Sequence, residues 1–238
     1  MKNEIKLDVK SGYDIWSKTY DVQKNPLIEL EEPDLFAIIG KVKNKTILDA
    51  GCGTGRISLH LLKKGAKVHG IDIGPNMIKN AKMKTEQYKN RCEFKLASLY
   101  KIPYQKNSFD IVVSNLVLSH IKNLDKVVNE MTRVLKPNGV MVISDMHPFA
   151  MVLGAGTSYV QDKKAYRIKN YIHMFEDFIK VLNKNKLKLV EVREPKISKR
   201  IKRTIIELSK EYGDRNPEKE FNKWVVKPGA MIIKAKKM

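Results

Sequence analysis

The sequence is poor in cysteine and has no long apolar run. Its 238 residues include two cysteines, Cys52 and Cys92, and neither lies in a Cys-x-x-Cys pair or near a histidine at metal-ligand spacing. Two cysteines are too few for a disulfide framework, so we expect neither a disulfide-stabilised fold nor a metal site. No run of about 18 apolar residues and no apolar segment of signal-peptide length occurs. These absences predict a cytoplasmic protein without membrane insertion.

Acidic residues are scarce relative to basic ones. The chain has 46 lysines and arginines against 26 aspartates and glutamates, a net charge of +20, and much of the excess lies after residue 150. Such a balance is compatible with a nucleic acid, an anionic membrane surface or an acidic substrate. Most of the basic residues are lysines, whereas arginine is better suited to bidentate phosphate recognition. The sequence therefore favours a solvated, lysine-rich surface over a binding groove.

Short apolar runs alternate with helical patterns through the first part of the chain. The runs rich in isoleucine and valine predict strands at 46–50, 66–71, 92–96, 109–114 and 139–144. Apolar residues at helical spacing predict helices at 55–64, 75–88 and 123–135. The later pattern predicts a helix at 166–183, a strand at 187–193, a helix at 204–212 and a strand at 230–235. This alternation is typical of an α/β fold with a parallel sheet wrapped by helices.

Three glycines occupy the turn between the first predicted strand and the helix after it. Gly51, Gly53 and Gly55 leave the backbone open to a ligand, and such a turn usually holds phosphate at a helix N-terminus. Their spacing differs from the dinucleotide pattern Gly-x-Gly-x-x-Gly. In addition, the carboxylate of Asp49 would repel a pyrophosphate but would suit a ligand that carries an ammonium or sulfonium charge.

Asp72 ends the second predicted strand, where an acid can accept hydrogen bonds from both hydroxyls of a ribose. Asp49 and Asp72 together therefore indicate a cationic nucleoside with an amino-acid tail, S-adenosyl-L-methionine. Four segments, DAGCGTGR, IDIGPNM, FDIVVSNLVLSHI and RVLKPNGVMVISD, resemble in order and spacing the motifs of class I S-adenosylmethionine-dependent methyltransferases. The resemblance is to the small-molecule branch that includes ubiquinone and menaquinone methyltransferases, and it is strong over residues 13–145.

The resemblance implies a Rossmann-like, seven-stranded, mostly parallel sheet with helices on both faces and an antiparallel last strand. We expect a single domain over 1–238, in which 1–40 form an N-terminal helical cap, 41–145 the cofactor-binding core and 146–238 the substrate-side segment, with an insertion at 196–228 before the last strand. The oligomeric state is left open between a monomer and a homodimer.

The resemblance also implies the cofactor-binding residues. Asp49 and the loop residues would line the methionine and ribose side, Asp72 would hold the ribose, and Asn115 and Leu116 would lie beside the sulfonium and the amino-acid tail. Ser98 stands where the family usually has an aspartate that reaches the adenine amino group. The full predicted set is Asp49, Gly51, Cys52, Gly53, Gly55, Asp72, Ile73, Met77, Ala97, Ser98, Leu99, Asn115 and Leu116. For Ile73 and Met77, predicted to flank the adenine, a plain core position is an equal alternative.

Methyl transfer from a sulfonium is an in-line displacement, so a general base is needed only when the nucleophile arrives protonated. The candidate catalytic residues are His120 after the fourth predicted strand, His147 after the fifth, and Tyr20 from the N-terminal cap. Tyr13 and Tyr159 are further candidates to close the site. Each histidine has a structural alternative, since a lone histidine is often a satisfied polar residue.

Three functions remain in competition. The leading one is a methyltransferase that acts on an O or N atom of a small molecule. Nucleic-acid methylation is disfavoured because the chain lacks the Asn/Asp-Pro-Pro-aromatic and Pro-Cys motifs of nucleobase methyltransferases, although the charge keeps an RNA-directed enzyme as an alternative. Ser98 motivates the third, a non-catalytic protein that binds S-adenosyl-L-methionine. Five basic residues could cover an anionic acceptor or form an exposed helix start: Lys196, Lys199, Arg200, Lys202 and Arg203.

Overall fold

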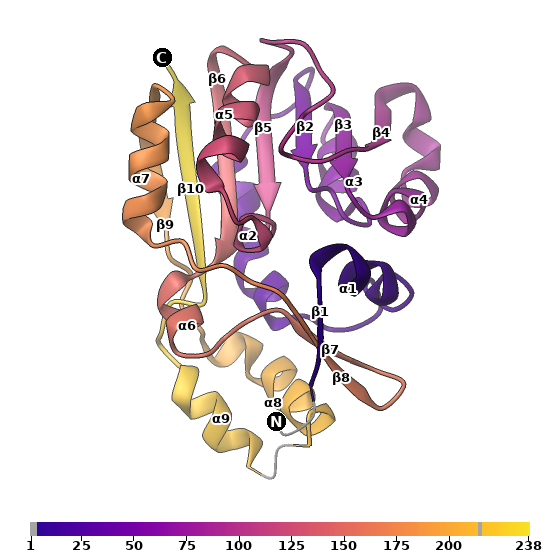
Figure 1. Cartoon of the computed structure of the whole chain (residues 1–238), viewed down its shortest axis with the longest axis vertical. Coiled ribbons are helices and arrows are strands. Elements are labelled where there is room, and N and C mark those ends of the chain that lie inside the picture. The colour runs from indigo at the N-terminus through magenta and orange to yellow at the C-terminus, as the bar shows by residue number, and fades with distance from the viewer. Residues whose placement is uncertain (1–3, 214–215) are drawn as a thin grey trace.

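A seven-stranded sheet lies at the centre of the computed structural model, which describes residues 4–213 and 216–238. The strand order is β4-β3-β2-β5-β6-β10-β9, and β10 runs antiparallel to both of its neighbours (Figure 1). The strands are β2 (Thr46–Ala50), β3 (Lys67–Asp72), β4 (Cys92–Leu96), β5 (Phe109–Asn115), β6 (Leu135–Met146), β9 (Leu187–Arg193) and β10 (Ala230–Lys237). This arrangement confirms the predicted Rossmann-like sheet with its antiparallel last strand.

Helices cover both faces of this sheet because neighbouring strand residues point to opposite sides. Leu48 of β2 packs in a core with Val127 of α5 (Leu124–Val134) and Leu182 of α7 (Phe175–Lys184). Ile47, the residue before Leu48, packs in a second core with α2 (Pro26–Ile39) and α3 (Arg56–Lys63). A further cluster joins α4 (Pro75–Lys84) to β4. The sheet is therefore buried on both faces, and the edge formed by its strand ends is where a ligand can enter.

A smaller structure lies beyond the carboxyl ends of the central strands (Figure 1). It contains a three-stranded sheet in the order β1-β8-β7, in which β1 is Ile5–Leu7, β7 is Ser158–Gln161 and β8 is Lys164–Ile168. Around it lie α1 (Val9–Trp16), α6 (Pro148–Val152), α8 (Lys202–Glu211) and α9 (Pro217–Trp224). Short 3-10 turns span Glu86–Arg91, Leu118–His120 and Lys199–Ile201.

The predicted helix over 166–183 is wrong in its first part. Residues 164–168 form strand β8, and α7 begins only at Phe175. Asp162 and Lys163 both have positive φ angles, 51° and 60°, which fit a tight hairpin turn between β7 and β8. The apolar side of this hairpin packs on Trp16 from the N-terminal segment, a contact between distant parts of the chain that a local pattern does not reveal.

The N-terminal segment contributes one helix to the smaller structure and one to the central sheet. Helix α1 lies with the small sheet and packs Trp16 against its hairpin, whereas α2 buries Leu35 and Ile38 directly on the central sheet. The helical cap expected over 1–40 thus includes one helix of the main core. Among the described residues, no helix is both long enough and apolar enough to cross a membrane.

Candidate active site

The three glycines of the turn after β2 share a left-handed backbone conformation. Gly51, Gly53 and Gly55 all have positive φ angles, 83°, 52° and 80°. A Cβ atom at position 51 would collide with the side chain of Val117, so this glycine is required by close packing. A Cβ atom at position 53 would meet nothing within 4 Å. Gly53 therefore marks the point where the loop leaves room for a ligand.

Asp72 at the end of β3 joins this loop to the next one. Its carboxylate accepts hydrogen bonds from the backbone N–H groups of Gly53, at 2.9 Å, and Gly74, at 2.8 Å. Burial raises the pKa of Asp72, while these two N–H groups act in the opposite direction. Since an ionised carboxylate has about four acceptor positions, Asp72 retains acceptor capacity for ligand hydroxyls beside the open space at Gly53.

Asp49 lies deeper than the sequence suggests. Its side chain is 1% exposed and accepts a hydrogen bond of 2.6 Å from Oγ of Ser58 on α3. Burial raises the pKa of Asp49 to about 6, and the Ser58 hydrogen bond partly opposes that rise. The carboxylate is thus held under the loop rather than at its mouth. It can favour a cationic ligand only through its electric field, which is strong where water is excluded.

The other predicted cofactor residues include both buried and exposed side chains. The side chain of Cys52 packs in a core cluster with Phe94, so its position in the loop offers a ligand only its backbone. Met77 and Leu99 are also buried, at 1% and 5% exposed, whereas Ile73 is 38% exposed. Ala97 donates its N–H to the carbonyl oxygen of Asp72, and Ser98 Oγ accepts the N–H of Tyr100 at 3.2 Å. These segments meet at the carboxyl ends of β3 and β4.

A buried polar network lies behind the end of β5. Glu31 on α2 accepts hydrogen bonds from Nδ2 of Asn115, at 2.7 Å, and from Oγ of Ser144 on β6. Arg56 donates to Oδ1 of Asn115 at 2.6 Å and lies 3.5 Å from Glu31. Burial raises the pKa of Glu31, and the nearby Arg56 lowers it. The network fixes the side chain of Asn115 at the predicted sulfonium side.

Sequence reasoning missed the partners in this network. Arg56 ends the glycine motif, so a charged residue there could have been recognised as part of the site. Glu31 could not, because it lies in the segment that the sequence predicts as an N-terminal cap. Asp145 was also missed as a site residue. It is 3% exposed, and it accepts the backbone N–H groups of Ser119 and Met146, both at 2.7 Å. Asp145 could have been recognised from its place near the end of β6, as the last residue of the motif RVLKPNGVMVISD.

His120 is brought to the site in a defined protonation form. Its Nδ1 lies 2.8 Å from the carbonyl oxygen of Lys169, which can only accept, so Nδ1 carries the proton. Its Nε2 then accepts from the hydroxyl of Tyr13 at 2.8 Å and lies 3.3 Å from Oγ1 of Thr157. Burial lowers the pKa of His120, which keeps the ring neutral, and raises the pKa of Tyr13 well above its usual value.

The two other catalytic candidates lie in different environments. Tyr20 lines the main cavity and packs edge-on against Trp16, and burial raises its pKa. His147 is the N-cap of α6, where Nδ1 accepts the N–H of Phe149 at 3.1 Å and Nε2 lies 2.9 Å from Glu194. Both ring nitrogens of His147 are thus engaged, and the residue caps α6 outside the lining of the main cavity.

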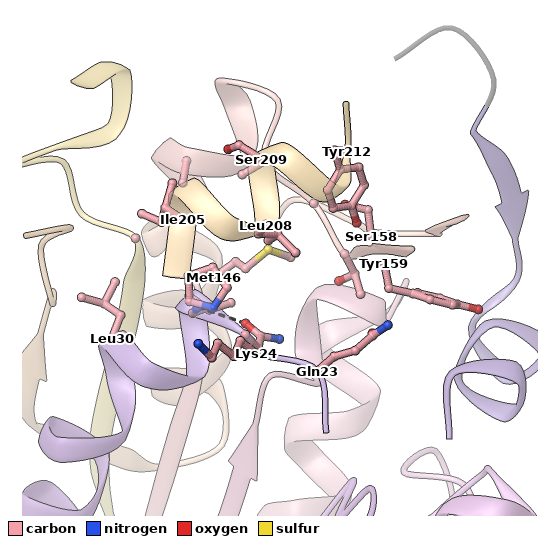
Figure 2. A pocket seen from close by; sticks show the side chains of 18 of the residues that line it. Gln23, Lys24, Leu30, Met146, Ser158, Tyr159, Ile205, Leu208, Ser209 and Tyr212 are labelled. Atoms are coloured by element: carbon pink, nitrogen blue, oxygen red, sulfur yellow. Dashed lines mark hydrogen bonds between the residues drawn. The ribbon is translucent and has the colours of Figure 1, made fainter. Parts of the chain in front are cut away.

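A cavity of about 720 Å³ extends from the strand ends into the smaller structure. Near the sheet it is lined by Tyr13, Tyr20, Leu116, Ser119 and Asp145. Farther out, Figure 2 shows Leu30 from α2 and Ile205, Leu208 and Tyr212 from the α8 region around the same space. Leu116 has a φ angle of 55° and donates its N–H to the carbonyl oxygen of Ser144, which fixes the wall between the strand ends and the cavity.

The five basic residues predicted to cover an anionic acceptor, Lys196, Lys199, Arg200, Lys202 and Arg203, do not line this cavity. Arg200 donates to the backbone carbonyl oxygens of Glu29 and Leu30, at 3.2 and 3.1 Å. Lys202 pairs with Glu218, and Arg203 pairs with Glu207, both at 2.8 Å. Arg200 and Lys202 thus connect the start of α8 to α2 and α9, and Arg203 pairs within α8. Of the two alternatives for this segment, these contacts favour a helix start over a cover on an anionic acceptor.

Comparison with known proteins places the chain in a family. Residues 41–207 match the model of a family described as "Methyltransferase domain". Over 142 residues the chain is 34% identical to demethylmenaquinone methyltransferase of Lactococcus lactis, and the match covers 56% of each chain. In other curated relatives, including a sterol methyltransferase and a ubiquinone O-methyltransferase, the match covers 32% and 44% of the relative. The chain thus spans about half or less of the length of these relatives.

Two solved structures show the same fold at low sequence identity. A structure described as a putative S-adenosylmethionine-dependent methyltransferase of Listeria monocytogenes superposes with a TM-score of 0.68 at 21% identity, covering 88% of this chain and 97% of that one. The [4+2]-cyclase SpnF superposes with a TM-score of 0.71 at 17% identity, covering 99% of both chains. The fold therefore extends through the N-terminal and late segments of this chain.

Proposed function

This chain belongs to the S-adenosyl-L-methionine-dependent methyltransferase family, and we propose that it methylates an oxygen or nitrogen atom of a small-molecule acceptor. One observation supports this proposal above the others. The cavity is lined by Leu116, just after β5, and by Asp145, near the end of β6, and the glycine turn follows β2, the strand next to β5 in the sheet. A donor held by the turn and an acceptor in the cavity would then lie at the same edge of the sheet.

The residues present fit the cofactor. When bound, S-adenosyl-L-methionine supplies an electrophilic methyl group on a sulfonium. Asp72 would accept the ribose hydroxyls beside Gly53, and Asn115, fixed by Glu31 and Arg56, would face the amino-acid tail. Asp49 would add a negative field from beneath the loop. The backbone at 97–99 and the exposed side chain of Ile73 would border the adenine.

The Tyr13–His120 pair would accept the proton of a hydroxyl acceptor. Tyr13 lines the cavity, whereas His120 does not, so the acceptor would meet the tyrosine first. As the new O–CH₃ bond forms, the acceptor proton would pass to the Tyr13 oxygen, and the phenol proton would pass to Nε2 of His120. The resulting imidazolium would lie near the carboxylate of Asp145, whose charge favours a positive ring. Such proton transfer typically contributes about 10²- to 10⁴-fold to a rate.

Calorimetric titration with S-adenosyl-L-methionine and S-adenosylhomocysteine tests the cofactor site. We expect binding of both ligands in the micromolar range and a loss of about 10- to 100-fold in Asp72→Asn, because charge-assisted hydrogen bonds to the ribose weaken. Asp110→Asn is the matched control. Asp110 also accepts a backbone N–H, from Thr46 at 2.8 Å, but at the start of β2, the opposite end of that strand. Absence of binding by both ligands would overturn the proposal.

RNA-directed methylation is the second candidate, and the net charge of +20 is the observation that favours it. It predicts steeply salt-dependent RNA binding that Arg200→Ala and Arg203→Ala weaken. Weak binding that disappears at moderate salt and is unchanged by both substitutions would count against it.

A non-catalytic protein that binds the cofactor is the third candidate. Ser98 is the observation that favours it, because it stands where the family usually has an aspartate and its Oγ is engaged with the N–H of Tyr100. Methylated product from any member of a library of small hydroxyl and amine compounds, at more than one turnover per protein, would reject this candidate.

A further inference from the structure

We propose that the cavity binds a large, mainly apolar and uncharged acceptor, with its reacting hydroxyl at Tyr13 and its body directed toward α8 and α9. This inference rests on the proposed function and names the substrate class of the same site. It differs from the sequence expectation of an anionic acceptor.

The walls of the outer cavity are apolar. Helix α8 is amphipathic: Ile205 and Leu208 face the cavity, while Lys202 and Arg203 pair with acids elsewhere. Both tryptophans of the chain also line the cavity. The main apolar contributors are Leu30, Trp16, Ile197, Ile201, Met146 and Trp224. Burial of a ligand's apolar surface is the contribution that such walls can make to binding.

Each of the three cations that line the cavity lies near an acid. Lys24 lies 2.7 Å from Glu207, and Arg167 lies 3.7 Å from Glu4. Lys223 lies 3.9 Å from Glu220, which also accepts a hydrogen bond from the indole of Trp224. A carboxylate or phosphate on the ligand would have to compete with these acids for each of the three cations. An uncharged body would disturb none of them.

The cavity is large and continuous. A volume of about 720 Å³ lies in the upper part of the range of about 300–1,000 Å³ typical of small-molecule sites. One continuous lining includes Tyr13, Leu116 and Asp145 at one end and Leu208 and Tyr212 at the other. An acceptor with one hydroxyl and an extended apolar part would reach the reacting position and the α8 wall together.

Intrinsic fluorescence tests this inference without turnover, since Trp16 and Trp224 both line the cavity. We would titrate the full chain with 4-methylphenol, 4-butylphenol and 4-nonylphenol, each below its aggregation concentration. The expected result is an affinity that rises about fourfold per buried methylene group, until the cavity is filled. Equal affinity along the series would overturn the inference.

Charge and location are tested by matched ligands and variants. The anion 4-nonylbenzoate should bind more weakly than 4-nonylphenol, and tighter binding of the anion would overturn the inference. Leu208→Phe should weaken nonylphenol more than methylphenol, and Leu208→Ala should weaken nonylphenol by removing contacts. Ile206→Phe, which lies outside the cavity lining on the same helix, should change neither. Equal effects of Leu208→Phe and Ile206→Phe would contradict the proposed location.

The outcomes separate the two proposals. If the phenol series binds as expected but S-adenosyl-L-methionine does not bind, the proposed function fails and the apolar site remains. If the cofactor binds and chain length has no effect on phenol affinity, the substrate class fails and the methyltransferase proposal remains.

Discussion

The hydroxyl of Tyr13 lies 2.8 Å from Nε2 of His120, although the two residues are separated by more than one hundred positions in the chain. Tyr13 comes from α1 in the small outer structure, and His120 follows β5 of the central sheet. The carbonyl of Lys169 fixes the proton on Nδ1. The pair therefore forms only when the outer structure is docked on the sheet.

The pair predicts a specific mutational pattern. Tyr13→Phe removes the group that contacts the acceptor, and His120→Asn removes the final proton acceptor, so each should lower kcat for a hydroxyl acceptor by about 10²-fold or more. Affinity for S-adenosylhomocysteine should change little. Tyr104→Phe is the control, since Tyr104 also has a hydroxyl hydrogen bond, to Glu93 at 3.2 Å, outside the cavity lining. Unchanged kcat in Tyr13→Phe would exclude the proposed proton transfer.

The lowered pKa of His120 predicts the acid side of the pH profile. The proton acceptor is the neutral ring, and burial favours that form. As pH falls from 8, kcat should stay constant through 6.5, the ordinary value for histidine, and fall only below it. A steady-state profile measured in wild type and in His120→Asn checks this. A decline centred at or above pH 6.5 in the wild type would contradict it.

The ionisation of Asp49 predicts that pH affects the binding of the cofactor more than the binding of its demethylated product. Its raised pKa of about 6 means that the buried carboxyl becomes ionised as pH rises from 5 to 7. Because the ionised form favours the sulfonium, affinity for S-adenosyl-L-methionine should rise by about tenfold more than affinity for neutral S-adenosylhomocysteine over this range. Parallel titrations at both pH values measure the difference, and Asp49→Asn should remove it.

The same shift has a consequence for stability. Between the ordinary pKa of 3.8 and about 6, the folded protein binds more protons at Asp49 than the unfolded chain does. This residue therefore lowers stability progressively as pH rises through that window, by about 3 kcal/mol at most. The stability of Asp49→Asn relative to wild type should increase from pH 4 to pH 7 in urea denaturation, and a constant difference would contradict the assignment.

Glu31 and Glu32 provide a matched pair for the buried network. Glu31 is fully buried and bonds Asn115 and Ser144, whereas the Glu32 side chain is 36% exposed and bonds only Arg56, at 2.6 Å. Glu31→Gln should lower the free energy of unfolding by about 3 kcal/mol, since it leaves buried partners mismatched. Glu32→Gln should cost less than about 1 kcal/mol. Equal urea midpoints for the two variants would contradict the role of the network.

The glycines of the loop predict a separation of folding from binding. Gly51→Ala should destabilise strongly, because its φ angle is 83° and the new methyl would collide with Val117. Gly53→Ala has open space and should cost only about 1 kcal/mol for its positive φ angle. It should nevertheless weaken cofactor binding by 10-fold or more, since the methyl would occupy the space left for the ligand. Thermal melts and calorimetry measure the two effects.

The sequence by itself determined the central sheet and predicted the site of the methyl donor. Alternating apolar runs specify strands buried on both faces, and Gly51, Gly53 and Asp72 are local signals because a tight turn and a strand end need those residue types nearby in the chain. The same logic failed at 166–174. The hairpin packs on distant Trp16, and the chain after it makes hydrogen bonds with Ser119 and His120.

Only the tertiary structure decided which side chains meet at the site. Glu31 reaches Asn115, and Tyr13 reaches His120, across separations that no periodic pattern encodes. His147 and Asp49 were assigned from residue type and strand position, but helix capping and burial under the loop set their surroundings. Likewise, the basic residues around α8 suggested an anionic ligand, but Ile205 of α8 packs in a cluster with Leu30, and the cavity beside this cluster has mainly hydrophobic walls. Side-chain direction and pairing arise from packing, which is why charge and composition alone did not reveal them.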